Sequence, residues 1–135
     1  LIDMGVEPCL ISSSLVGVLA QRLLRRLCPK CKAEWELTAA LKQRLAFFGA
    51  DVNAQYFHAG GCEECRGTGY KGRVGIFELL PITPALSELI LQRRSSGQIK
   101  AAAHETILTM QKDAMQKAHS GLTSVEEVLR VCSGD

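Results

Sequence analysis

The sequence lacks the local signatures by which many catalytic sites are recognised. It has no Gly-x-x-x-x-Gly-Lys-Ser/Thr phosphate loop, no Gly-x-Ser-x-Gly nucleophile elbow and no His-Glu-x-x-His helix. Its three histidines, His58, His104 and His119, are scattered and lie outside metal-ligand spacing. These absences predict that the chain holds no catalytic residue and no nucleotide-binding residue, and that it catalyses nothing alone.

Long apolar runs and targeting segments are also missing. The longest weakly polar stretch, residues 8–20, contains three serines and is shorter than the roughly 20 residues of a membrane-spanning helix. The chain opens at Leu1 without a secretory signal, which favours a segment of a longer protein. Hydrophobic residues make up 47% and charged residues 22% of the 135 residues, a balance typical of a packed globular protein.

Four of the six cysteines form two Cys-x-x-Cys pairs, Cys28 with Cys31 and Cys62 with Cys65. Two intervening residues let one tight turn present both thiolates to the same ion, and zinc takes four such ligands in a tetrahedron. The spacing therefore predicts one structural zinc ion, closed to water. Redox or disulfide chemistry and inert core cysteines are the alternatives. Cys9 and Cys132 are expected to be small buried hydrophobes.

Glycines follow the second pair and fit a metal site. Gly67 and Gly69 allow left-handed backbone angles, so that amide hydrogens can point at the thiolates. With Gly72 they also match the Gly-x-Gly-x-x-Gly dinucleotide fingerprint, but no strand is expected before them and no helix after them. The metal interpretation is therefore preferred.

A basic cluster lies beside the first cysteine pair. Four thiolates around one divalent ion contribute a net charge of −2, which brings the formal charge of +2 near neutral. The net charge therefore gives little support to nucleic-acid binding. We interpret the cluster as a solvated face that offsets the anionic centre; phosphate or partner binding is the alternative. Its members are Arg22, Arg25, Arg26, Lys30 and Lys32.

Periodicity and capping residues predict the elements. Ser12 to Ser14 are expected to cap a helix that runs to residue 27, with apolar residues at helical spacing. A second helix is expected from Thr38 to Gly49, and strands over residues 55–59 and 74–80. Further helices, forming a small bundle, are expected to start at Thr83-Pro84, Ser96, Thr109 and a Thr123–Glu126 capping box.

Four blocks of the sequence resemble the C-terminal portion of bacterial type II secretion and type IV pilus assembly ATPases. They occur in the family's order around the same four cysteines. The blocks are LIDMGVEP (residues 1–8), ISSSLVGVLAQRL (11–23), GYKGRVGIFELL (69–80) and GLTSVEEVLRV (121–131).

The resemblance implies an α+β segment of a RecA-like, hexameric ATPase. Residues 1–27 would end the nucleotide-binding domain, 28–65 would form the zinc subdomain, and 66–135 a returning strand and helical C-terminal domain. ATP and Mg²⁺ would bind upstream of the segment. Gln21 and Arg22 match an arginine-containing block of the family, for which a subunit-interface role is one interpretation.

The implied role is ATP-driven assembly of a pseudopilus for type II secretion, in the cytoplasm and peripheral to the inner membrane. Partners would be the other subunits of the hexamer and the platform proteins of that membrane, with no nucleic acid. A pilus assembly ATPase is the alternative within the family. A non-enzymatic zinc module of chaperone or nucleic-acid-binding type is the alternative outside it.

Overall fold

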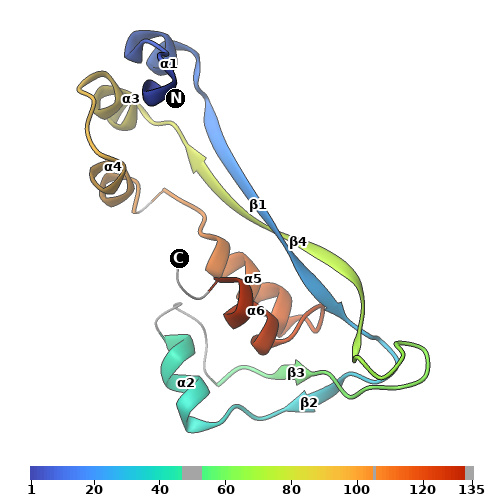
Figure 1. The fold of residues 1–135 in the computed structure, drawn as a ribbon. Helices are drawn as coiled ribbons and strands as arrows, with labels where there is room; N and C mark the ends of the chain where they lie inside the picture. Colours follow the sequence, from blue (N-terminus) through green and yellow to red (C-terminus); the bar gives the residue numbers. More distant parts are fainter. Residues whose placement is uncertain (47–52, 105, 133–135) are drawn as a thin grey trace. The chain divides into compact units, whose positions relative to one another are not determined.

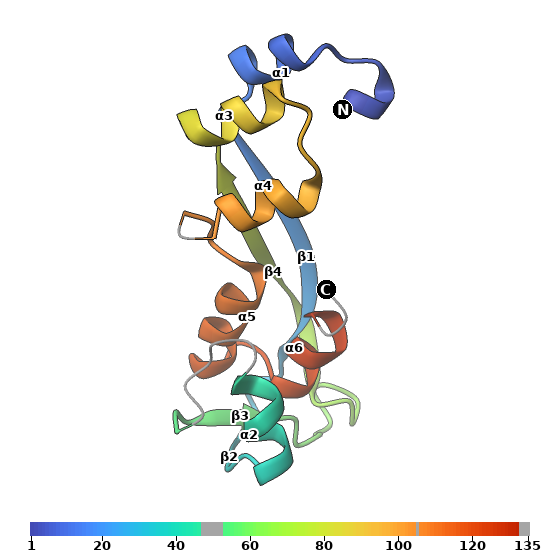
Figure 2. The same ribbon diagram turned by 90° about the vertical axis from the view of Figure 1, so that its left-hand side faces the viewer.

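The computed structural model describes residues 1–46, 53–104 and 106–132, and within them the chain is α+β (Figures 1 and 2). The coarse fold class expected from the sequence is thus confirmed, whereas the RecA-like part stays a prediction. The elements are a short 3-10 helix η1 (Ile2–Met4), helices α1 (Pro8–Ser14), α2 (Ala39–Ala46), α3 (Pro84–Leu91), α4 (Ser96–Ala102), α5 (Met110–His119) and α6 (Val125–Cys132), and strands β1 (Gly17–Leu27), β2 (Ala33–Trp35), β3 (Tyr56–His58) and β4 (Tyr70–Pro81).

The chain divides into two compact units. Unit 1 consists of residues 1–20 and 78–108, and unit 2 of residues 21–77 and 109–135. Helices α3 and α4 pack together in unit 1, whereas α5 and α6 pack together in unit 2. The helices expected as one C-terminal bundle are therefore shared between the units. The domain boundaries predicted at residues 27 and 65 remain predictions.

The expected helix ending at residue 27 is wrong: this segment forms strand β1, which pairs with β4 in a two-stranded sheet. Leucine, alanine, glutamine and arginine are good helix formers, so local propensity favours a helix here. Pairing with the strongly β-forming residues 74–80 overrides that preference. The serines that were expected to cap a helix instead end α1, whose signal was Pro8 at the first helical position.

The strand and cap predictions after residue 38 are largely confirmed. Strand β3 lies within the expected segment 55–59, and β4 includes the expected segment 74–80. Thr83 and Thr109 cap α3 and α5 with their hydroxyl oxygens. Helix α2 begins after Thr38 as expected, while its expected end at Gly49 lies outside the described residues.

Helix α4 starts at Ser96 as expected, and the cap of α6 is displaced by one residue from its expected position. The residue before α4, Ser95, caps it in a reciprocal capping box with Gln98. The Ser124 hydroxyl, not that of Thr123, accepts a hydrogen bond from the Glu127 amide at the start of α6. Helix α6 therefore begins one residue later than the Thr123–Glu126 box requires.

Unit 2 has a hydrophobic core between its helices and the β2–β3 hairpin. Strands β2 and β3 pair antiparallel, with Trp35 opposite Tyr56, and β3 contacts both α5 and α6. Tyr56 is 2% exposed within this core, where Leu24 from β1 and Ile76 from β4 meet the helices. The core thus joins the hairpin to the strands that lead into and out of it.

Candidate metal centre

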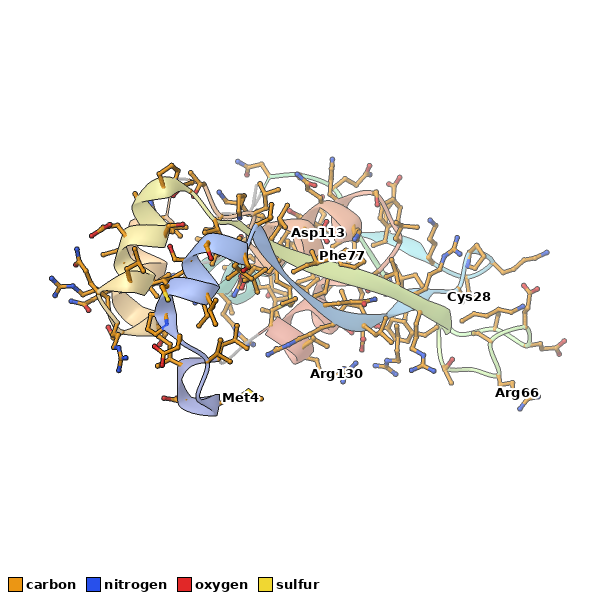
Figure 3. All side chains as sticks on the ribbon, turned by 90° about the horizontal axis from the view of Figure 1, so that it is seen from above. Met4, Cys28, Arg66, Phe77, Asp113 and Arg130 are labelled. Atoms are coloured by element: carbon orange, nitrogen blue, oxygen red, sulfur yellow. The ribbon has the colours of Figure 1, made fainter. Side chains whose placement is uncertain are left out.

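The two cysteine pairs lie in the two turns that join the hairpin to the long strands. Cys28 directly follows β1 and Cys31 precedes β2, while Cys62 and Cys65 lie between β3 and β4. Cys28 and Cys65 are buried, and Cys31 and Cys62 are half-buried. The fold therefore brings together, at one end of the β1–β4 ribbon, the four cysteines that the sequence pattern selects (Figure 3 labels Cys28).

The sulfur atoms have the spacing of a tetrahedral metal site. All four lie within 4.8 Å of one another. Cys28 Sγ lies 3.8 Å from Cys62 Sγ, Cys31 Sγ 3.8 Å from Cys65 Sγ, and Cys62 Sγ 3.7 Å from Cys65 Sγ. A tetrahedron with zinc–sulfur distances of about 2.3 Å has sulfur–sulfur edges of about 3.8 Å. The four side chains therefore fit one zinc ion.

Backbone amides donate hydrogen bonds to two of the four sulfur atoms. The amide of Gly61 donates to Cys31 Sγ at 3.2 Å, and the amides of Cys62 and Gly69 donate to Cys65 Sγ at 3.2 and 3.1 Å. Such donors orient the ligands and stabilise negative charge on sulfur. This pattern fits thiolate ligands better than inert core thiols.

The turn after Cys65 requires glycine at a defined position. Gly69 has a φ of +81°, and a Cβ there would collide with Ala59. Gly67 also has a positive φ, 78°, but a Cβ there would meet open space. The close approach at Gly69 places its amide against Cys65 Sγ, as the sequence pattern predicted for these glycines.

The cysteine thiols ionise unequally. Burial raises the pKa of Cys31 to about 11. Burial also opposes ionisation of Cys65, but the hydrogen bonds from the Cys62 and Gly69 amides prevail and lower the pKa of that thiol to about 6. Metal binding requires all four as thiolates and so releases protons.

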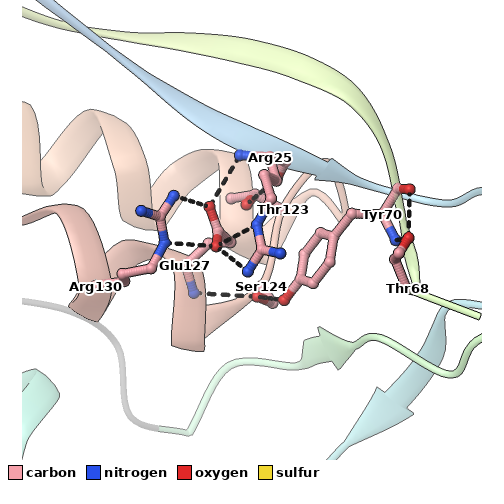
Figure 4. Close-up of polar contacts among 7 residues, drawn as sticks. All are labelled: Arg25, Thr68, Tyr70, Thr123, Ser124, Glu127 and Arg130. Carbon is pink, nitrogen blue, oxygen red and sulfur yellow. Dashed lines mark hydrogen bonds and ion pairs between the residues drawn. The ribbon is translucent and has the colours of Figure 1, made fainter.

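A buried carboxylate anchors the root of the site to α6 (Figure 4). Glu127 is 1% exposed, and its oxygens accept from the Arg25 amide at 2.9 Å, the Arg25 Nε at 2.8 Å and the Arg130 Nε and Nη2 at 2.9 and 2.8 Å. Burial raises the pKa of this carboxyl, but the arginine and amide hydrogen bonds outweigh it and lower the pKa to about 2. Glu127 is therefore ionised, and both of its carboxylate oxygens accept hydrogen bonds from Arg25 and Arg130.

The neighbouring contacts extend this anchor to the start of β4. The Tyr70 hydroxyl lies 2.6 Å from the Ser124 hydroxyl, and the Arg25 guanidinium stacks over the Tyr70 ring at 4.2 Å (Figure 4). The Thr123 hydroxyl donates to the Arg25 carbonyl at 2.9 Å. No local sequence pattern predicts the links from Arg25 and Tyr70 to α6, because these two residues lie 102 and 54 positions from their partners.

The basic cluster predicted beside the first pair is partly used inside the protein. Arg25 binds Glu127, the Lys32 ammonium donates to the Gly121 carbonyl at 3.1 Å, and Arg22 Nη1 donates to the Val131 carbonyl at 2.8 Å. These contacts favour a structural role for three of its five members. Gln21 and Arg22 receive no functional role from these contacts, and the interface interpretation stays a prediction.

The remaining cysteines lie outside the cluster. Cys132 is buried, as expected, but Cys9 is exposed, so the expectation of a buried Cys9 is wrong. Cys9 lies on α1, of which only Pro8 and Ile11 are buried. Among the described residues, no other group of three or more cysteine, histidine or acidic side chains comes together.

Fold and site together define an α+β protein with a tetracysteine cluster at the root of a β-hairpin. A family profile described as "Type II/IV secretion system protein" matches residues 1–130. The chain therefore belongs to the type II/IV secretion system protein family, and the resemblance seen in its sequence is confirmed.

Individual relatives agree with this membership. The chain is 45% identical over 130 residues to the type II secretion system ATPase E of Vibrio cholerae, covering 96% of this chain and 25% of the relative. It is 42% identical over 129 residues to the type IV pilus assembly ATPase PilB of Thermus thermophilus, covering 94% and 14%. It is 43% identical over 135 residues to the type II secretion system protein E of Aeromonas hydrophila, covering 98% and 26%. The chain thus spans about a quarter or less of the length of these relatives.

Proposed function

We propose that the chain is the C-terminal, zinc-containing segment of the ATPase that powers type II secretion through pseudopilus assembly. Family membership supports the ATPase assignment, and most of the named relatives are type II secretion proteins. Similar identity to pilus assembly ATPases keeps that role as the second candidate. The parent enzyme is then a hexamer at the cytoplasmic face of the inner membrane, and ATP and Mg²⁺ bind outside this segment.

We propose further that Cys28, Cys31, Cys62 and Cys65 hold one structural zinc ion. The observation that carries this proposal is the match between the sulfur–sulfur distances and the edges of a zinc tetrathiolate tetrahedron. Four protein ligands leave no position for water, so the ion would stabilise the turns and supply no catalysis. No helix among the described residues is long and apolar enough to cross a membrane.

Zinc would make the hairpin and the α5–α6 pair one stiff body within unit 2. The metal would close the turns beside β1 and β4, while the Glu127 network fixes the same strand ends to α6. A stiff closed site suits transmission of a motion better than chemistry. In this proposal, a RecA-like domain that ends near residue 27 lies directly before this body in the chain. We therefore propose that the body passes nucleotide-dependent movement of that domain to a partner at the membrane.

Metal content and secretion by the full-length protein test these proposals separately. Elemental analysis of chain purified without added metal is expected to give one zinc per chain; none would overturn the metal assignment. Cys28→Ser with Cys31→Ser in the full-length protein is expected to abolish secretion, with Cys9→Ser as the matched control. Normal secretion by the double variant would overturn the transmission role while leaving the metal result standing.

Two assays of the isolated chain test the alternative of a nucleic-acid-binding zinc module and the expectation that the segment has no activity alone. The isolated chain is expected to hydrolyse no ATP and to shift no nucleic acid in gels at low salt. Nucleic-acid binding that weakens steeply as salt rises would revive the interpretation as a nucleic-acid module. Loss of type IV pili with normal secretion in a strain that lacks the full-length protein would favour the pilus candidate.

A further inference from the structure

Side chains of α5 occupy the outer edge of β4. The Phe77 amide donates to Asp113 Oδ2 at 2.8 Å, and the Gly75 carbonyl accepts from the Lys117 ammonium at 2.6 Å. Asp113 and Lys117 also form an ion pair at 2.9 Å, one helical turn apart. Figure 3 shows Asp113 and Phe77 next to each other. Two alternate residues of the strand are thus hydrogen-bonded to a helix rather than to another strand.

The outer edge of β1 is occupied in the same way from α6 and the turn before it. The Arg25 amide donates to Glu127 and the Arg25 carbonyl accepts from the Thr123 hydroxyl, both at 2.9 Å. The Leu27 amide donates to the Leu122 carbonyl, again at 2.9 Å. In a strand, alternate residues direct their amide and carbonyl to the same edge. The outward backbone groups of residues 25 and 27 on β1 are therefore hydrogen-bonded to α6 and the turn before it, just as those of residues 75 and 77 on β4 are hydrogen-bonded to α5.

A two-stranded ribbon needs such cover. Two strands alone are marginally stable in water, and an open strand edge is a template for pairing with another chain. The segment around Phe77 is rich in β-forming residues, and Phe77 itself is 38% exposed. A third strand would cover this edge but would itself expose a new open edge. A helix side chain that binds the outward backbone groups covers the edge without exposing another.

We propose that Asp113 and Lys117 are a guard that closes the Gly75–Phe77 edge of β4 to strand pairing with a second copy of this chain. The carboxylate takes the place of a strand carbonyl and the ammonium that of a strand amide. The Lys117 ammonium also lies 4.9 Å from the centre of the Phe77 ring, so the same charge shields the exposed aromatic face. The inference is independent of metal binding and of the secretion role.

The test uses the 135-residue chain as it is purified, with or without bound metal. Asp113→Ala with Lys117→Ala is expected to convert a monomer into dimers or larger species, measured by size-exclusion chromatography with light scattering. The infrared spectrum is expected to gain an intermolecular β-sheet band. Lys112→Ala with Gln116→Ala is the matched control, because both residues are exposed on the same helix. Association by the control as well as by the double variant would overturn the proposal.

Amide hydrogen exchange separates the guard from a general loss of stability. In Asp113→Ala at low protein concentration, the Phe77 amide is expected to exchange about tenfold faster, the effect of one lost hydrogen bond to a charged group. Amides of α6 should be unchanged. Asp113→Asn keeps an acceptor for this amide and should stay protected and monomeric. If the double variant unfolds, Asp113→Ala decides: an unchanged Phe77 exchange rate together with a monomeric state would overturn the proposal.

Discussion

Replacing Glu127 by glutamine removes a charge that five nitrogen–oxygen contacts hold in place. Breaking a buried ion pair usually costs about 3–5 kcal/mol. Here the partners Arg25 and Arg130 are 50% and 56% exposed, so solvent recovers part of that loss. The pKa of the carboxyl falls from 4.5 to about 2, which by itself corresponds to an upper bound of about 3 kcal/mol. We expect Glu127→Gln to lose about 2–3 kcal/mol of unfolding free energy.

Urea unfolding measures this loss. With a urea dependence of about 2 kcal/mol per molar, the midpoint should fall by about 1–1.5 M with an unchanged slope. Glu126→Gln is the matched control, since Glu126 is exposed on the same turn of α6. It should shift the midpoint only slightly. A shift for Glu127→Gln no larger than that of the control would refute the reasoning.

The same reasoning predicts how the stabilising contribution of Glu127 changes with pH. The folded pKa of Glu127 lies below the unfolded value, so its contribution is present above pH 4.5 and is lost as the pH falls toward 2. The difference in stability between wild type and Glu127→Gln should therefore shrink between about pH 5 and pH 2. Loss of the proposed zinc ion at low pH would affect both proteins alike, so it would largely cancel in the difference. A constant difference across that range would show that the charge is not the cause.

Three further outcomes follow from the site. Removing metal with a chelator should lower the circular dichroism signal and expose four titratable thiols, and restored zinc should reverse both; unchanged spectra in a chain proved metal-free would contradict a structural ion. Gly67→Ala should destabilise the fold by about 1–2 kcal/mol of backbone strain. Gly69→Ala should destabilise it by more and should also weaken metal binding, because only this variant collides with Ala59. Equal losses of stability for the two variants in a calorimetric scan would contradict this reasoning. Ser124→Ala should lower the unfolding free energy by about 1 kcal/mol, because the helix cap is lost, and it should lower the thermal midpoint. An unchanged midpoint would show that Ser124 is not the cap that stabilises α6.

The sequence predicted those features that depend on short-range chemistry. The two Cys-x-x-Cys turns specify their own geometry, and the four thiols meet as expected. Thr83 before Pro84 favours a helix start, because the capping hydroxyl and the fixed proline angle act locally. Strand β4 was visible because its β-branched and aromatic residues suit few alternatives.

The failures concern features decided by distant residues. The apolar residues of β1 recur at helical spacing, so local periodicity and propensity both favour a helix. The segment is a strand because it pairs with β4, which lies about 50 residues away in the chain. The cap of α6 is Ser124, whereas the Thr123 hydroxyl donates to the Arg25 carbonyl, a residue 98 positions away in the chain. Glu127 looks like an ordinary surface charge, and its burial follows from arginines about 100 positions away and three positions away.

The spacing of the two cysteine pairs also sets an order of events during synthesis. Each pair is local and can hold a metal ion before the chain has folded, whereas joining the pairs must close a loop of 30 residues. That closure costs about 3 kcal/mol of chain entropy, which two further thiolate–zinc bonds in the proposed site would outweigh. Cys28 and Cys31 leave the ribosome first. In the proposed zinc site, the first two ligands are therefore complete about 30 residues of synthesis before the second two.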